Sequence, residues 1–206
     1  MKIICIGRNY SEHAKEMKSE VPTQPIIFLK PQTALLKDNK PFYHPEWSKD
    51  IHYETELVLR VSKQGKYIEE KFAYKYIDEI NLGIDFTARD IQAAQKAKGL
   101  PWEISKAFDS SAVIGSASKK ETDAIERLKQ GVHFYLLLNG KEVQRGNSAD
   151  MVFSVDKIIA YASQYFTLQV GDLIYTGTPV GVGAVKIGDR LEGYLEADKV
   201  FDFEIK

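Results

Sequence analysis

The sequence predicts a single α+β domain in which strands predominate and the helices are few and short. Apolar runs of strand length, bounded by glycine or proline, recur along the whole chain. Few segments have the caps and composition of a helix, and no repeat, low-complexity tract or linker divides the chain. A chain of 206 residues that is 44% hydrophobic is long enough to bury a core. We therefore expect residues 1–206 to form one domain.

The first half of the chain is predicted to combine strands with two helices. Strands are expected at residues 2–6, 26–31, 51–61 and 80–86. Asn9 begins a capping-box pattern for a short helix that continues to about Met17. Thr87 begins a second capping box, for a helix over 88–98, and Gly99 is placed to end that helix.

The second half is predicted to be mostly β. Residues 133–138 and 141–144 flank Asn139-Gly140, which is a strong signal for a two-residue hairpin. A helix capped by Ser154 is expected to continue to Tyr165. The remaining strands are expected at 173–175 and, as two further strands, in the last twenty residues.

Composition excludes several classes of protein. The formal net charge of −1 gives no overall basic surface for nucleic acid, so any anion has to be bound locally. The apolar run near the N-terminus is too short for a signal sequence or a membrane span. Cys5 lies in an apolar strand and has no second cysteine with which to form a disulfide. We therefore expect a cytoplasmic protein.

Three acidic residues are candidates for a metal site. In a strand, His52, Glu54 and Glu56 would share one face. Taken alone, this spacing is more typical of a solvated face. Asp85 changes the interpretation, because it ends a very apolar run in which a carboxylate rarely lies without a partner. Three oxygen ligands suit Mg²⁺ or Mn²⁺, and no Cys or His cluster indicates structural zinc.

A second candidate is the pair His13 and Glu16, which a helix brings onto one face. A carboxylate that orients an imidazole raises its basicity, as is needed to activate water. The same spacing also fits an ordinary surface pair, and the two interpretations remain open on spacing alone.

Local cations could hold an anionic substrate beside such a metal. Arg8, Lys30 and Lys106 lie next to strand or turn signals and not in charged runs. The glycine-rich segment 176–183 lacks both nucleotide-binding patterns, so nucleotide binding is disfavoured. Its small residues around Thr178 still allow a backbone to approach a small ligand closely, although a plain tight turn explains them as well.

Taken together, five blocks resemble the fumarylacetoacetate hydrolase family in order and spacing over nearly the whole chain. They are Gly7–Tyr10, Phe28–Pro31, His52–Leu57, Gly83–Gln92 and Thr176–Pro179. The resemblance implies a mixed β-sandwich roll with a few short helices, and a homodimer.

The resemblance also assigns roles to residues. It matches Glu54, Glu56 and Asp85 to the family's Mg²⁺ or Mn²⁺ ligands. Within the family, the small acylpyruvate hydrolase and oxaloacetate decarboxylase members are the most similar. Their lid dyad matches His13 and Glu16, their active-site lysine matches Lys106, and Gln92 and Thr178 match residues that contact substrate.

We therefore expect metal-dependent cleavage of a C–C bond in a small 2-oxo acid, through a metal-stabilised pyruvate enolate. The substrates would be acylpyruvates, oxaloacetate or both, with Arg8 and Lys30 helping to bind them. One alternative is an isomerase or tautomerase of 2-hydroxydienedioate or oxaloacetate substrates, in which the same enolate is reprotonated. Another is a non-catalytic β domain that binds a divalent ion for structure or for contact with a partner.

Overall fold

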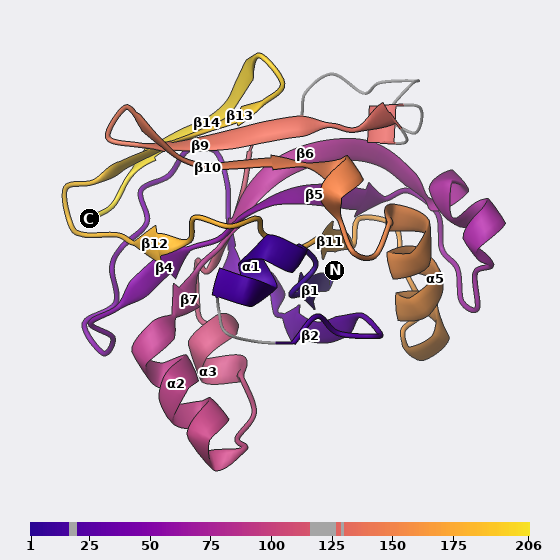
Figure 1. The fold of residues 1–206 in the computed structure, drawn as a ribbon, viewed down its shortest axis with the longest axis horizontal. Helices are drawn as coiled ribbons and strands as arrows, with labels where there is room; N and C mark the ends of the chain where they lie inside the picture. Colours follow the sequence, from indigo (N-terminus) through magenta and orange to yellow (C-terminus); the bar gives the residue numbers. More distant parts are fainter. Residues whose placement is uncertain (17–19, 116–126, 129) are drawn as a thin grey trace.

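The computed structural model describes residues 1–16, 20–115, 127–128 and 130–206. Within these residues the chain forms three sheets and a few short helices (Figure 1). The strands are β1 Ile3–Gly7, β2 Ile26–Lys30, β3 Leu35–Leu36, β4 Ile51–Tyr53, β5 Thr55–Val61, β6 Ile77–Asp85, β7 Thr87–Ala88, β8 Ala112–Ile114, β9 His133–Leu138, β10 Lys141–Asn147, β11 Leu173–Tyr175, β12 Gly183–Ala184, β13 Arg190–Leu195 and β14 Asp198–Glu204. The helices are α1 Ser11–Glu16, α2 Arg89–Lys98, α3 Glu103–Lys106 and α5 Val155–Tyr165, with 3-10 turns at Gln32–Ala34, Glu70–Tyr76 and Ser148–Asp150. The predicted α+β organisation is confirmed.

The largest sheet contains the strands on which the site is built. In the described part of the chain it has seven strands, in the order β2-β1-β11-β5-β6-β8-β3. β1 lies parallel to β11, whereas β5 pairs antiparallel with both β11 and β6. Every residue of β6 except Asp78 is buried, as expected for a strand covered on both faces. The apolar strand predicted at 80–86 is therefore confirmed, and it begins earlier, at Ile77.

A second, antiparallel sheet of β10, β9, β13 and β14 covers one side of the first (Figure 1). Phe134, Leu191 and Phe203 of this sheet are buried in one core with residues of β6. Asn139 and Gly140 have φ angles of 52° and 78°, which are the left-handed values that a type I′ hairpin needs. The predicted hairpin is confirmed.

Two of the helices, α2 and α3, pack against each other and against β7. α2 and α3 lie together on the opposite side of the molecule from the four-stranded sheet, and α5 packs against Glu70–Tyr76 (Figure 1). α5 follows Ser154 and ends at Tyr165, as predicted, but the side chain of Ser154 makes no capping hydrogen bond and donates to Asp156 instead. Gly99 ends α2 in the left-handed conformation, again as predicted. No helix in the described residues is long and apolar enough to span a membrane.

The predicted cap of α2 is wrong. Thr87 lies in β7, and the residue at the N-cap position is Ala88, which makes no side-chain capping bond. The Thr87 hydroxyl instead donates to Glu54 Oε1 at 3.0 Å. The side chain that the local pattern assigned to the helix cap therefore binds the buried carboxylate of Glu54, which lies between β4 and β5.

The predicted cap at Asn9 is also wrong. α1 begins at Ser11. The buried carboxamide of Asn9 donates to the carbonyls of Phe153 and Thr176 and accepts from the Phe153 N–H. Asn9 therefore joins two distant segments of backbone, while Met17, where the helix was predicted to end, lies outside the described residues.

The strand predicted at 51–61 is divided at Glu54. β4 belongs to a small third sheet with β7 and β12, whereas β5 belongs to the large sheet. The expected alternation therefore does not continue from His52 to Glu56, and His52 Nε2 lies 2.8 Å from Asp50 Oδ1. Cys5, in contrast, is the buried strand residue that the sequence predicted.

Candidate active site

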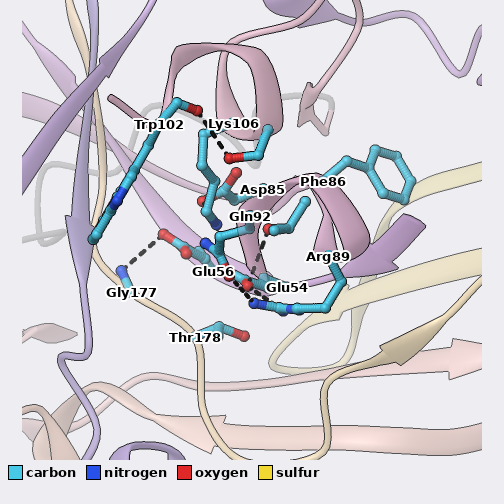
Figure 2. A network of polar contacts seen from close by, with 12 residues as sticks. Glu54, Glu56, Asp85, Phe86, Arg89, Gln92, Trp102, Lys106, Gly177 and Thr178 are labelled. Carbon is cyan, nitrogen blue, oxygen red and sulfur yellow. Dashed lines mark hydrogen bonds and ion pairs between the residues drawn. The ribbon is translucent and has the colours of Figure 1, made fainter. Parts of the chain in front are cut away.

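Two adjacent strands bring the three predicted carboxylates together. Glu54 lies at the break before β5, Glu56 lies on β5, and Asp85 ends β6. The Asp85 N–H donates to the Glu54 carbonyl at 2.8 Å, so strand pairing itself places these two residues side by side. One ligand oxygen from each of the three carboxylates lies within 4.8 Å of the others. All three residues are at most 6% exposed, and Figure 2 shows how they converge.

Basic side chains surround these carboxylates. Lys106 Nζ, from α3, donates to Glu54 Oε2 and to Asp85 Oδ2, each at 2.7 Å. Arg89 Nη2, from α2, donates to Glu54 Oε1 at 2.6 Å. Glu56 has no cationic partner among the described residues, and its Oε2 accepts the Gly177 N–H at 2.8 Å. The three acids are therefore unequally neutralised.

This asymmetry separates the titration behaviour of the two glutamates. Burial opposes ionisation of Glu54, but the charges of Lys106 and Arg89 outweigh it and hold the pKa of Glu54 well below its usual range. Burial, reinforced by the charges of Asp85 and Glu54, raises the pKa of Glu56. Burial lowers the pKa of Lys106, but the charges of Asp85 and Glu54 outweigh it and raise that pKa above its usual value.

The donor set fits a hard divalent cation. Three carboxylates supply only oxygen ligands, which Mg²⁺ and Mn²⁺ prefer. The Lys106 ammonium lies between two of these carboxylates, so the fold already places a positive charge there. Glu56, which forms no ion pair among the described residues, has the most to gain from a bound cation. These three residues are therefore suited to hold the metal.

Lys30 lies beside Asp85 and is 1% exposed. Its Nζ lies 2.6 Å from Asp85 Oδ1 and donates to the Ser111 carbonyl and hydroxyl, each at 2.9 Å, and to the Phe86 carbonyl at 3.3 Å. An ammonium has three N–H donors, and protein groups already engage them. Lys30 is thus arranged to fix Asp85, and it does not line the pocket described below.

The His13 and Glu16 pair is assembled as the spacing on α1 predicts. His13 Nδ1 lies 3.0 Å from Glu16 Oε2, and His13 is 5% exposed. Both Glu16 oxygens accept from the Gly181 N–H, at 3.2 and 3.3 Å. The carboxylate is therefore anchored to the glycine-rich segment while it orients the imidazole.

The segment after β11 is fixed against the strand that carries the glutamates. The Thr178 hydroxyl donates to the Thr55 carbonyl at 2.9 Å. Gln144, on β10, accepts the Thr55 N–H at 3.0 Å and donates to the Thr178 hydroxyl at 2.9 Å. Gly177 has a φ of 100°, and a Cβ there would lie 2.6 Å from the Cβ of Asn9. This segment is therefore held in a conformation that requires glycine.

A cavity of about 40 Å³ lies over the carboxylates. Its walls include eight of the predicted residues, namely Arg8, His13, Glu54, Glu56, Asp85, Gln92, Lys106 and Thr178. Glu16 and Lys30 do not line the cavity, but they contact His13 and Asp85, which do. The cavity is also lined by four residues that were not predicted to have a role in the site, namely Phe28, Arg89, Lys96 and Trp102.

The pattern of α2 could have identified two of these residues. Arg89, Gln92 and Lys96 are three and then four residues apart, so they share one face of the predicted helix. Arg89 Nη1 donates to Gln92 Oε1 at 2.8 Å, which confirms that the first two are neighbours. Because Gln92 was a candidate, its neighbours on the same face were candidates as well.

Comparison with known proteins gives a consistent result. Residues 2–206 match the family described as fumarylacetoacetate (FAA) hydrolase C-terminal. The mitochondrial oxaloacetate tautomerase FAHD1 of Mus musculus is 39% identical over 204 residues, which cover 99% of this chain and 91% of that protein. The mitochondrial oxaloacetate decarboxylase of Dictyostelium discoideum is 41% identical over 206 residues, which cover 99% of this chain and 93% of that protein. Since both relatives are mitochondrial, a cytoplasmic location stays a prediction.

A solved structure extends the similarity to the fold. Fumarylpyruvate hydrolase from Pseudomonas aeruginosa, in complex with Mn²⁺ and pyruvate, superposes with a TM-score of 0.92 and is 33% identical. The match covers 100% of this chain and 89% of that one.

Proposed function

Because the chain belongs to the fumarylacetoacetate hydrolase family, we propose that it binds Mg²⁺ or Mn²⁺ at Glu54, Glu56 and Asp85 and moves a proton at C3 of a small 2-oxo acid. One observation supports the proposal most directly. The three carboxylates and the imidazole of His13 line the same cavity. An imidazole that can accept and donate protons therefore faces the same cavity as the three carboxylates that can bind a cation.

The cation and the acidic residues have separate parts in this proposal. When bound, the ion supplies a Lewis acid that stabilises negative charge developing on the 2-oxo group. Glu54, Glu56 and Asp85 hold the ion. Thr87 and Gly177 support this by donating to Glu54 and Glu56, which fixes the direction of both carboxylates.

His13 is the proposed acid and base. Its Nδ1 is engaged by Glu16, so Nε2 is the ring nitrogen that remains for a substrate. From the keto form, Nε2 takes a proton from C3 and delivers it to the oxygen of the enolate; from the enol form the same proton moves in the opposite direction. The positive charge that the ring acquires in between is stabilised by Glu16. The proton transfer converts the keto and enol forms into each other.

Lys106 supplies positive charge inside the site. It is buried, and the charges of Asp85 and Glu54 raise its pKa, so it stays protonated. An ammonium at this position stabilises negative charge on the oxygens of a 2-oxo acid as the enolate forms. Gln92 and Thr178 complete the wall of the cavity and limit how the substrate can turn.

Cleavage of a C–C bond is the second candidate, and similarity to an oxaloacetate decarboxylase and to a fumarylpyruvate hydrolase favours it. Oxaloacetate would lose CO₂ and leave the pyruvate enolate. An acylpyruvate would be attacked at its distal carbonyl by a water that His13 deprotonates, and the bond between that carbonyl carbon and C3 would then break to release a carboxylic acid and the pyruvate enolate. Both routes take place in the same cavity and pass through an enolate, so the products decide between them.

The test is a product analysis on metal-stripped protein to which Mg²⁺ or Mn²⁺ is added back. Acetylpyruvate, fumarylpyruvate and the enol form of oxaloacetate are incubated, and enol absorbance, pyruvate and CO₂ are followed. We expect the oxaloacetate enol to disappear faster than it does without protein, to give a product of the same mass, and only when the ion is added. Pyruvate and CO₂ as the main products would favour cleavage, and no ion-dependent turnover of any substrate would refute the proposal.

A matched pair of variants separates the site from the surface. Glu56→Gln removes one proposed ligand, whereas Glu69→Gln makes the same chemical change at an exposed position before Glu70–Tyr76. The first should lose turnover and the second should retain it.

A further inference from the structure

The cavity has more basic side chains than acidic ones. Among the described residues, its walls carry the carboxylates of Glu54, Glu56 and Asp85 and four basic side chains, those of Arg8, Arg89, Lys96 and Lys106. Arg89 and Lys106 form ion pairs with these carboxylates. A divalent ion would add further positive charge. The loaded cavity therefore has positive charge in excess, which favours a ligand with more than one negative charge.

Arg8 is one of the two cations without an acidic partner. It follows β1 and has a φ of 58°, a left-handed conformation that is uncommon for a residue other than glycine. Such backbone strain persists only where surrounding contacts hold it, and it occurs often at ligand sites. No carboxylate lies within ion-pair distance of Arg8 in the described part of the chain, although its side chain lines the cavity.

Lys96 is the other. It lies on α2, one turn after Gln92, with its side chain at the exposed rim of the cavity. Its Nζ lies 5.8 Å from the centre of the Trp102 ring, so an aromatic face and not a carboxylate is its nearest described partner. Partial burial, with the charges of Arg89 and Arg8, lowers the pKa of Lys96 although part of the residue remains exposed. The two arginines therefore disfavour the charged form of Lys96, and an anion bound beside Lys96 and Arg8 would offset this repulsion.

From this arrangement we propose that Lys96 and Arg8 bind the carboxylate at the end of the substrate remote from its 2-oxo group, so that the enzyme selects short 2-oxo dicarboxylic acids over 2-oxo acids with a neutral end. The inference rests on the proposed function, because that function places the 2-oxo acid group at Glu54, Glu56 and Asp85. The remote end of a short substrate then meets the rim formed by Lys96, Arg8 and Trp102. The two positive charges suit a carboxylate, and the face of the Trp102 ring attracts the Lys96 ammonium and so positions it at this rim.

The kinetic test compares oxaloacetate with its 4-methyl ester, which has the same carbon skeleton and one carboxylate fewer. The reaction followed is the conversion of enol to keto form, which both compounds can undergo. For this reaction the Mg²⁺-loaded wild type should have a kcat/KM for oxaloacetate at least about 10-fold above that for the ester, since a charge-assisted hydrogen bond discriminates by about that factor. Lys96→Met should reduce this preference severalfold, mainly by raising KM for oxaloacetate, and Lys96→Arg should restore it. Lys98→Met is the control, because Lys98 is exposed on the same helix and does not line the cavity.

A binding test without turnover uses malate and 2-hydroxybutanoate, which differ only in the remote carboxylate. Malate should raise the melting temperature of the Mn²⁺-loaded wild type more than 2-hydroxybutanoate does, and Lys96→Met should remove that difference. Equal effects of the two ligands on the wild type would overturn the inference, as would an unchanged preference in Lys96→Met. If no substrate is turned over, the proposed function fails, and the two ligands still decide whether a site for the remote carboxylate exists.

Discussion

The backbone N–H of Asp85 donates to the carbonyl of Glu54 at 2.8 Å, across the pair of strands that builds the site. Because β5 and β6 are antiparallel and Glu56 lies opposite Gly83, the same register brings the third carboxylate next to the other two. The metal site is therefore a consequence of strand pairing in the middle of the large sheet. Loops and helices add the basic groups around it.

The pH dependence of metal binding should follow from Glu56. Burial and the neighbouring acids raise the pKa of Glu56, so at pH values between its ordinary and its raised pKa the metal-free folded protein holds a proton that the unfolded chain has released. The stability that this proton contributes should be lost as the pH rises through the raised pKa. A cation has to displace the proton at lower pH.

We therefore expect the rise in melting temperature caused by Mn²⁺ to grow as the pH increases and to shrink as it falls. Thermal melts with and without Mn²⁺ over a pH series measure this. A Mn²⁺ effect that was constant or larger at low pH would contradict the assignment of Glu56.

Loss of His13 should affect hydrolysis of an acylpyruvate more strongly than decarboxylation of oxaloacetate. His13→Ala should reduce hydrolysis of an acylpyruvate by about 100-fold or more, because it removes the base that activates water. Decarboxylation of oxaloacetate needs no water attack and should fall less. Glu16→Gln should have a smaller effect than His13→Ala on both reactions, because it leaves the ring in place. Equal losses of hydrolysis and decarboxylation in His13→Ala would argue against the role given to the dyad.

Gly177 offers a test of the packing behind Glu56. Gly177→Ala forces a residue with a Cβ to a φ of 100° and brings that Cβ within 2.6 Å of Asn9. Gly188 has a similar φ of 95° with nothing within 4 Å of the added atom, so Gly188→Ala has the backbone strain without the clash. We expect a loss of about 1 kcal/mol in unfolding free energy for Gly188→Ala and about 3 kcal/mol for Gly177→Ala. Urea denaturation measures both, and equal losses would show that the contact with Asn9 does not matter.

Gln144 should couple stability to activity. It is 2% exposed, and its amide joins Thr55, between the two glutamates, to Thr178 and Pro179. Gln144→Ala leaves buried polar groups without partners, so we expect a loss of about 2 kcal/mol in unfolding free energy. Turnover should fall too, because Glu54 and Glu56 flank Thr55. Gln164→Ala, at an exposed position of α5, is the control. Turnover at the wild-type rate in Gln144→Ala would contradict the proposal that Gln144 positions the two glutamates.

Much of this fold was predictable where a local pattern and the tertiary contacts favour the same structure. The apolar run of β6, the Asn139-Gly140 turn and the end of α2 at Gly99 are of this kind. The two capping boxes were wrong because the side chains of Asn9 and Thr87 are used by partners distant in the sequence. A capping rule considers only residues close in the sequence, so it cannot predict hydrogen bonds to these distant partners.

The same distinction applies to the site. The spacing of Glu54 and Glu56 and the apolar setting of Asp85 predicted three carboxylates that the structure brings together. The sequence did not reveal that strand 51–61 divides at Glu54, because the division depends on pairing of β4 with β7 and β12. Lys30 was predicted beside substrate, but its burial behind Asp85 depends on Ser111 and Phe86, which no sequence pattern connects to it.

The central claim is that Glu54, Glu56 and Asp85 together hold one divalent cation, and calorimetric titration of metal-stripped protein with Mn²⁺ and Mg²⁺ tests it most directly. We expect one ion per chain in the wild type and an affinity at least about 10-fold lower in Glu56→Gln. Glu69→Gln should bind like the wild type. Absence of uptake by the wild type, or the same affinity in Glu56→Gln, would contradict the claim.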